Sequence, residues 1–137
     1  TAESLYSRLF SAGAEVLKTI LPAYLEDRIE LREQDHAKAT FTKKLTRDDG
    51  KINWQKPPEY LERFIRAMDP WPGAWTSVKT LPINSDRGKS VKPKRLKILK
   101  ARLQNNKLVL DQIQLEGKKP VSFKQFQDGY PQAKIGG

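Results

Sequence analysis

Residues 95–115 of the chain read RLKILKARLQNNKLVLDQIQL, and this stretch decides the fold. Apolar and basic residues partly alternate over Arg95–Leu103, which is typical of a strand with one buried face. Asn105 and Asn106 favour a tight hairpin turn, and Lys107–Leu115 has the aliphatic residues of a returning strand. The stretch therefore predicts two antiparallel strands.

A helix is predicted upstream, over Lys56–Asp69. Pro57 or Pro58 suits its first turn, where a missing backbone N–H does no harm. Its apolar residues recur at three- and four-residue spacing, which is typical of a helix with one buried face. The predicted buried residues are Leu61, Phe64, Ile65 and Met68.

Two further elements complete the predicted sheet and its cover. Ala74–Val78 predicts a short strand, and Leu81–Lys94, with prolines and many charges, predicts a loop. Ser122 opens S-F-K-Q, a capping-box pattern that predicts a short helix ending near Gly129. Short strands with a covering helix and a basic surface favour an α+β fold, a small OB-like β-barrel with a helix packed on it.

The N-terminal segment predicts a separate helix, over Thr1–Asp27, followed by a linker. Apolar residues recur there at three- and four-residue spacing and form a broad face. We expect Pro22 to kink or interrupt the last turns. Residues 28–40 are polar and without periodicity, as in a linker. A face this broad predicts a partner domain.

Composition excludes several classes of site. The chain has 137 residues, no cysteine and one histidine, His36. Disulfides, thiolate metal sites, cysteine catalysis and multi-histidine metal sites are therefore excluded. No apolar run approaches the length of a membrane-spanning helix, and no signal-peptide core occurs at the start. These features predict a cytoplasmic protein without metal and without membrane partners.

The charge is unevenly distributed. Residues 1–40 hold five Lys/Arg and seven acids, whereas residues 41–137 hold 21 Lys/Arg and nine acids. Between Arg87 and Lys100 there are seven basic residues and no acid. A half-chain with a net charge of +12 predicts a polyanion-binding surface.

Residues 39–76, ATFTKKLTRDDGKINWQKPPEYLERFIRAMDPWPGAWT, resemble the signature of the C-terminal domain of the methionyl-tRNA formyltransferase family. The resemblance is carried by the following segments: Ala39-Thr40, Lys44-Leu45, Ile52-Asn53-Trp54, Ile65-Arg66-Ala67, Asp69–Trp75 (DPWPGAW), Arg95–Ala101 and Gly117–Phe126. The chain departs from the family in a shortened stretch between Arg102 and Leu108 and in an insertion at Thr80–Lys94. We expect a smaller or differently closed barrel from these departures.

The resemblance implies a division into two parts. Residues 1–36 would be the last helix and linker of a formyltransferase catalytic domain, and residues 37–137 an OB-like tRNA-binding domain. The family transfers a formyl group from 10-formyltetrahydrofolate to the amino group of initiator methionyl-tRNA in translation initiation. The implied partners are the tRNA acceptor arm and the chain's own N-terminal catalytic domain. The family's catalytic motifs do not occur in these 137 residues, so we expect the chain alone to bind no cofactor and to be inactive.

Candidate phosphate contacts follow from the basic clusters taken together with this resemblance. Lysines and arginines suit phosphate groups, with recognition of RNA shape rather than of bases. The candidate tRNA-binding residues are Lys43, Lys44, Arg47, Arg63, Arg66, Arg95, Lys97, Lys100, Lys118 and Lys119. We expect Trp71 and Trp75 to pack the helix against the barrel rather than to stack on bases.

Three alternatives stay open at this point. The chain is also compatible with the C-terminal domain of a sugar-nucleotide or folate formyltransferase, although such substrates need no long basic surface. A free-standing nucleic-acid-binding module is the second alternative, against which the apolar face of the N-terminal helix argues. The third is a basic protein–protein adaptor, which tRNA binding measured against a heparin control would distinguish.

Overall fold

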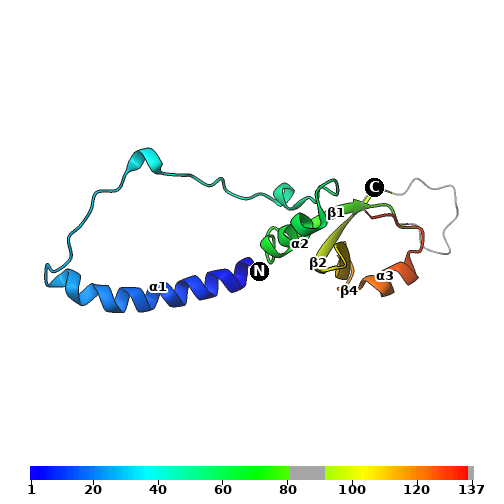
Figure 1. Cartoon of the computed structure of the whole chain (residues 1–137). Coiled ribbons are helices and arrows are strands. Elements are labelled where there is room, and N and C mark those ends of the chain that lie inside the picture. Colours follow the sequence, from blue (N-terminus) through cyan, green and yellow to red (C-terminus); the bar gives the residue numbers. More distant parts are fainter. Residues whose placement is uncertain (81–91, 136–137) are drawn as a thin grey trace. The chain divides into compact units, whose positions relative to one another are not determined.

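The computed structural model describes residues 1–80 and 92–135 and contains two compact units. One unit covers Glu3–Leu45, and the other consists of Thr46 onward together with Thr1–Ala2 (Figure 1). Of the loop predicted over Leu81–Lys94, residues 81–91 lie outside the described residues. The boundary after residue 36 stays a prediction.

The unit that begins at Thr46 contains an antiparallel sheet of four strands, in the order β1-β2-β3-β4. The strands are β1 (Ala74–Val78), β2 (Lys94–Gln104), β3 (Lys107–Leu115) and β4 (Val121–Ser122). Asn105 and Asn106 both have positive φ, 50° and 57°, as a type I′ hairpin turn requires. The predicted hairpin is confirmed, and in the described part of the chain β1 and β4 are the edges of an open sheet.

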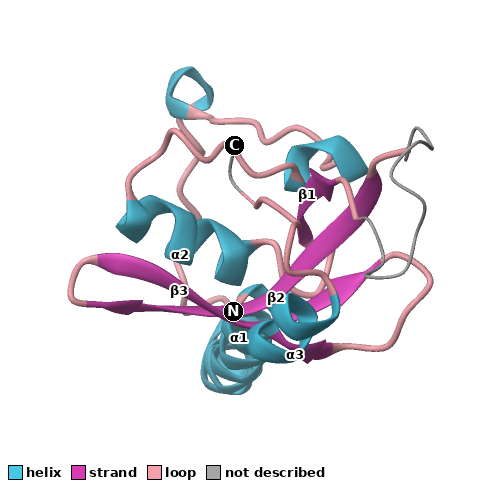
Figure 2. Cartoon of the chain, turned by 90° about the vertical axis from the view of Figure 1, so that its right-hand side faces the viewer, coloured by secondary structure: helices cyan, strands magenta, loops and turns pink. Residues whose placement is uncertain are grey.

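Two helices cover one face of this sheet, α2 (Pro58–Ala67) and α3 (Phe123–Gly129), and Figure 2 shows α2 beside the long β2–β3 hairpin. Leu61 and Ile65 of α2 and Phe126 of α3 are buried in one apolar core with the sheet. Strand β2 contributes Leu96 and Ile98 to that core, and β3 contributes Ile113 and Leu115. The predicted α+β fold, with a helix packed on the strands, is confirmed.

The helix starts depend on local hydrogen bonds. In α3, the Gln125 backbone N–H donates to Ser122 Oγ at 3.2 Å, and the Ser122 N–H donates to Gln125 Oε1 at 3.0 Å. This is the capping box predicted from the sequence. A similar bond, from Thr46 N–H to Asp49 Oδ2 at 2.7 Å, begins the short 3₁₀ helix Arg47–Gly50.

The other unit contains α1 (Ala2–Leu25) from Glu3 onward, an extended linker and a short 3₁₀ helix, His36–Lys38. The helix predicted at the N-terminus is confirmed, but Pro22 does not interrupt it, since it continues to Leu25. None of its residues is buried within the described structure. No helix in residues 1–80 or 92–135 is long and apolar enough to span a membrane.

Candidate nucleic-acid interface

The sheet has a second face that α2 and α3 do not cover. Leu96 and Ile98 of β2 point into the core, so the alternating residues Arg95 and Lys97 point to the opposite side. On that side, Lys97 lies directly between Trp75 of β1 and Gln114 of β3 in the strand register. We call this side the open face.

The position of Arg95 on the open face is set by Trp75. The guanidinium carbon lies 4.1 Å from the centroid of the indole ring, within the range of a cation–π contact. The indole Nε1 donates a hydrogen bond of 2.8 Å to the carbonyl oxygen of Arg47, and Trp75 is only 8% exposed. Lys51 Nζ lies 5.9 Å from the same ring. A fixed ring therefore holds the Arg95 charge at the surface.

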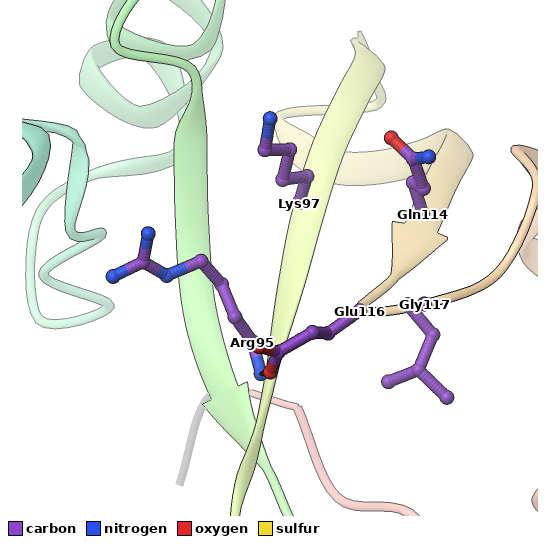
Figure 3. Close-up of a pocket in the computed structure, with 6 residues that line it drawn as sticks. Arg95, Lys97, Gln114, Glu116 and Gly117 are labelled. Atoms are coloured by element: carbon purple, nitrogen blue, oxygen red, sulfur yellow. Dashed lines mark hydrogen bonds between the residues drawn. The ribbon is translucent and has the colours of Figure 1, made fainter.

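A pocket of about 250 Å³ lies beside Arg95, between β2 and the end of β3 (Figure 3). Residues of both strands and of the following turn line it: Arg95, Lys97, Gln114, Leu115, Glu116 and Gly117. Glu116 accepts a hydrogen bond from the Arg95 backbone N–H at 3.1 Å and donates its own N–H to the Arg95 carbonyl at 2.9 Å. These bonds fix the wall of the pocket at the Arg95 end.

The turn after β3, which carries two further lysines, borders the pocket. The Lys118 N–H donates to the Leu115 carbonyl at 2.9 Å, and Gly117 has φ of +75°, which favours glycine. Gln114 Nε2 donates to the Lys118 carbonyl at 2.9 Å. Lys118 and Lys119 are exposed in this turn. The open face and its turn thus gather cations from two places in the sequence.

The structure brings some of the predicted contact residues together and separates others. Arg95 and Lys97 belong to the open face. Arg47 and Lys118 border it through their backbone carbonyls, which accept from Trp75 and Gln114, and Lys119 is exposed in the same turn as Lys118. Lys100 lies on β2 beside a register shift. Arg63 and Arg66 lie instead on α2, which packs against the opposite face of the sheet. One flat surface cannot contact both groups.

Arg66 is also engaged by a carboxylate of its own helix. Its Nε and Nη2 donate to Glu62 Oε1 and Oε2 at 2.6 Å and 3.0 Å. These hydrogen bonds, and the charge of Glu62, raise the pKa of Arg66. Lys43 and Lys44 are exposed in the unit of Glu3–Leu45. Whether any of the ten residues contacts RNA stays a prediction.

The open face includes two residues that the sequence reasoning missed, Lys51 and Gln114. Lys51 reaches Trp75 through an isolated parallel bridge, a contact between distant residues that no local pattern shows. Gln114 could have been placed from the sequence. It lies between Ile113 and Leu115, which are both buried, and successive residues of a strand point to opposite faces.

The tryptophans differ from expectation. Trp71 is 54% exposed, so its predicted role in the core is wrong. Trp75 is buried, but on the open face rather than between helix and sheet. Trp54 packs against the core and donates from Nε1 to Thr76 Oγ1 at 3.1 Å. The Asp69–Gly73 corner leaves Trp71 at the surface because the chain turns there into β1.

Residues 44–107, which include α2, β1, β2 and the first residue of β3, match the family described as formyl transferase, C-terminal domain. The match covers somewhat less than half of the chain. A methionyl-tRNA formyltransferase of Roseiflexus castenholzii is 39% identical over 137 residues, covering 92% of the chain and 44% of the relative. The methionyl-tRNA formyltransferase of Roseiflexus sp. (strain RS-1) is 52% identical over 79 residues, covering 58% of the chain and 24% of the relative.

A more distant relative confirms the extent of this similarity. The methionyl-tRNA formyltransferase of Staphylococcus aureus is 30% identical over 146 residues, covering 97% of the chain and 47% of the relative. The chain thus spans less than half the length of these relatives. The predicted relation to the C-terminal part of methionyl-tRNA formyltransferases is confirmed, and Arg95 and Lys97 of the open face lie within the residues that match the family model.

Proposed function

We propose that this chain is the tRNA-holding C-terminal part of a methionyl-tRNA formyltransferase. The observation that carries the proposal is the pair of cations Arg95 and Lys97 on the one sheet face that α2 and α3 leave open, with the exposed lysines 118 and 119 in the turn that borders it. The names of the relatives support it, since each is a methionyl-tRNA formyltransferase. A sugar-nucleotide substrate would need no surface of this kind.

The open face would act through the phosphates of the acceptor arm. Each phosphate that a lysine or arginine neutralises releases condensed counterions, which supplies affinity without reading sequence. Phosphate contacts also fix the orientation of a bound nucleic acid. Because the cations stand on paired strands, they would hold the aminoacylated end of the tRNA in one place relative to the active site. The C-terminal part would then raise the rate of formyl transfer by positioning the substrate.

The rest of the reaction would belong to a catalytic domain joined to residues 1–36. That domain would bind 10-formyltetrahydrofolate and transfer its formyl group to the amino group of initiator methionyl-tRNA. We assign no residue of this chain to the formyl donor. Among the described residues there is no group of three or more His, Asp or Glu side chains that would hold a metal ion. Translation initiation places the enzyme in the cytoplasm.

Binding of fluorescently labelled tRNA by the full chain tests the proposal. We expect a dissociation constant on the order of 10⁻⁴–10⁻⁶ M at physiological salt, with steep salt dependence. Lys97→Glu on the open face should weaken binding strongly. Arg63→Glu on α2 changes the net charge equally and should weaken it much less. Equal losses in the two variants, or no binding by the wild type, would contradict the proposal.

The linker lysines are a second part of the same proposal. Lys43 and Lys44 lie at the start of the signature segment, residues 39–76, whereas Arg28 and Arg32 lie in the net-negative part of the chain. Replacing both lysines by glutamate should therefore weaken tRNA binding more than replacing both arginines. Indistinguishable binding of the two double variants across a salt titration would remove the linker from the interface.

A further inference from the structure

The open face carries amide side chains beside its cations, and the proposed function does not use them. Gln114 lies directly opposite Lys97 in the register of β2 and β3. Side chains in directly opposite positions of an antiparallel pair have their Cβ atoms about 5 Å apart. In Figure 3 the Lys97 and Gln114 side chains rise on the same side of the two strands. A group that meets the Lys97 ammonium is therefore within reach of the Gln114 amide.

The orientation of the Gln114 amide is held by the turn. One of its Nε2–H groups donates to the Lys118 carbonyl at 2.9 Å, and Gln114 is partly buried. This bond uses one amide proton, while the carbonyl oxygen Oε1 is an acceptor with no proton of its own. The pocket therefore combines the Lys97 ammonium with an oriented amide that can accept a hydrogen bond, while the Arg95 guanidinium extends toward Trp75 of β1 (Figure 3).

This combination matches one nucleotide of an RNA backbone. A ribose 2′-hydroxyl sits on the carbon next to the one that bears the 3′-phosphate, so neighbouring side chains can meet both groups. Double-stranded RNA is recognised largely through its phosphates and the 2′-hydroxyls of its wide minor groove. At one end of the pocket the Glu116 carboxylate accepts a hydrogen bond from the Arg95 backbone N–H. Because a phosphate is repelled by that carboxylate, we expect it at the other end, beside Lys97.

We propose that the pocket binds a single ribose–phosphate unit, with Lys97 on the phosphate and Gln114 Oε1 accepting from the 2′-hydroxyl. Gln114 is then a specificity-determining residue that makes the domain prefer RNA to DNA. Arg95 is held by Trp75 of β1 next to this unit and adds to the positive charge of the open face. This inference rests on the proposed function and deepens it.

The test compares three hairpins of one sequence, made of RNA, of 2′-O-methyl RNA and of DNA. The methylated hairpin keeps the A-form but has no 2′ donor. By fluorescence anisotropy at one salt concentration, we expect the full chain to bind RNA about threefold to tenfold more tightly than 2′-O-methyl RNA, as one hydrogen bond would provide. Gln114→Leu should remove this difference and leave binding to DNA unchanged.

Two variants serve as controls. Gln104→Leu makes the same replacement at an exposed position of β2 outside the pocket and should keep the preference. Lys97→Met should weaken binding to all three hairpins alike. The inference is overturned if the wild-type chain binds the RNA and methylated hairpins equally. It is also overturned if the Gln114→Leu variant still prefers the RNA hairpin to the methylated one. If tRNA still binds with a steep salt dependence in that case, the proposed function stands. If the chain binds neither tRNA nor any of the three hairpins, both the inference and the proposed function are overturned.

Discussion

Replacing Trp75 by phenylalanine is expected to destabilise the domain by about 1–3 kcal/mol. The phenyl ring preserves part of the packing but loses the 2.8 Å hydrogen bond to the Arg47 carbonyl, which is worth about 1 kcal/mol. Since Trp75 is only 8% exposed, the smaller ring also leaves unfilled volume beside Gly50 and weakens the contact with Arg95. The sum of these losses gives the expected range.

The matched control is the same replacement at Trp71. That side chain is 54% exposed, and a surface substitution of this kind changes stability by about 0.5 kcal/mol or less. Urea denaturation followed by far-UV circular dichroism measures the free energy of unfolding of both variants. If Trp75→Phe and Trp71→Phe lowered it equally, Trp75 would not be the buried support of the open face, and the explanation of the Arg95 position would be wrong.

Three further predictions concern the domain and the reaction. Gly50→Ala should lower the free energy of unfolding by about 1–3 kcal/mol, because an added Cβ would overlap the Gly73 carbonyl oxygen. The same change at Gly129, where a Cβ meets nothing within 4 Å, should have little effect, and equal losses in urea denaturation would disprove the close approach. Ser122→Ala should lower the same quantity by about 0.5–2 kcal/mol through loss of the α3 cap, and an unchanged urea midpoint would contradict this. The purified chain should not formylate methionyl-tRNA, and turnover above that of a boiled sample would refute that expectation.

The elements with strong local signals could be predicted from the sequence. β1 and β3 have the predicted bounds, because alternation and the Asn105-Asn106 turn are local features. The cap of α3 was predictable for the same reason. Strand β4 was not predicted, since its two residues are too few to show a period. Its pairing depends on β3, which is a tertiary effect.

The site was less predictable than the fold. The basic clusters gave the right residue types, but the sequence does not show which face of the sheet each cation reaches. Arg63 and Arg95 are separated because α2 packs on the face opposite Arg95, and only the tertiary arrangement determines that. The contact of Arg95 with Trp75 joins strands that are separated along the chain by an insertion, so no local spacing indicates it.

The most direct test of the central claim is a titration of the isotopically labelled chain with tRNA, followed by amide NMR shifts. We predict that the largest changes fall on Arg95, Lys97, Gln114 and the Lys118 turn, while the amides of α2 change little. The indole N–H of Trp75 should shift as well, since the indole ring is in contact with the Arg95 guanidinium. Shifts confined to α2, or none on the open face at saturating tRNA, would contradict the account.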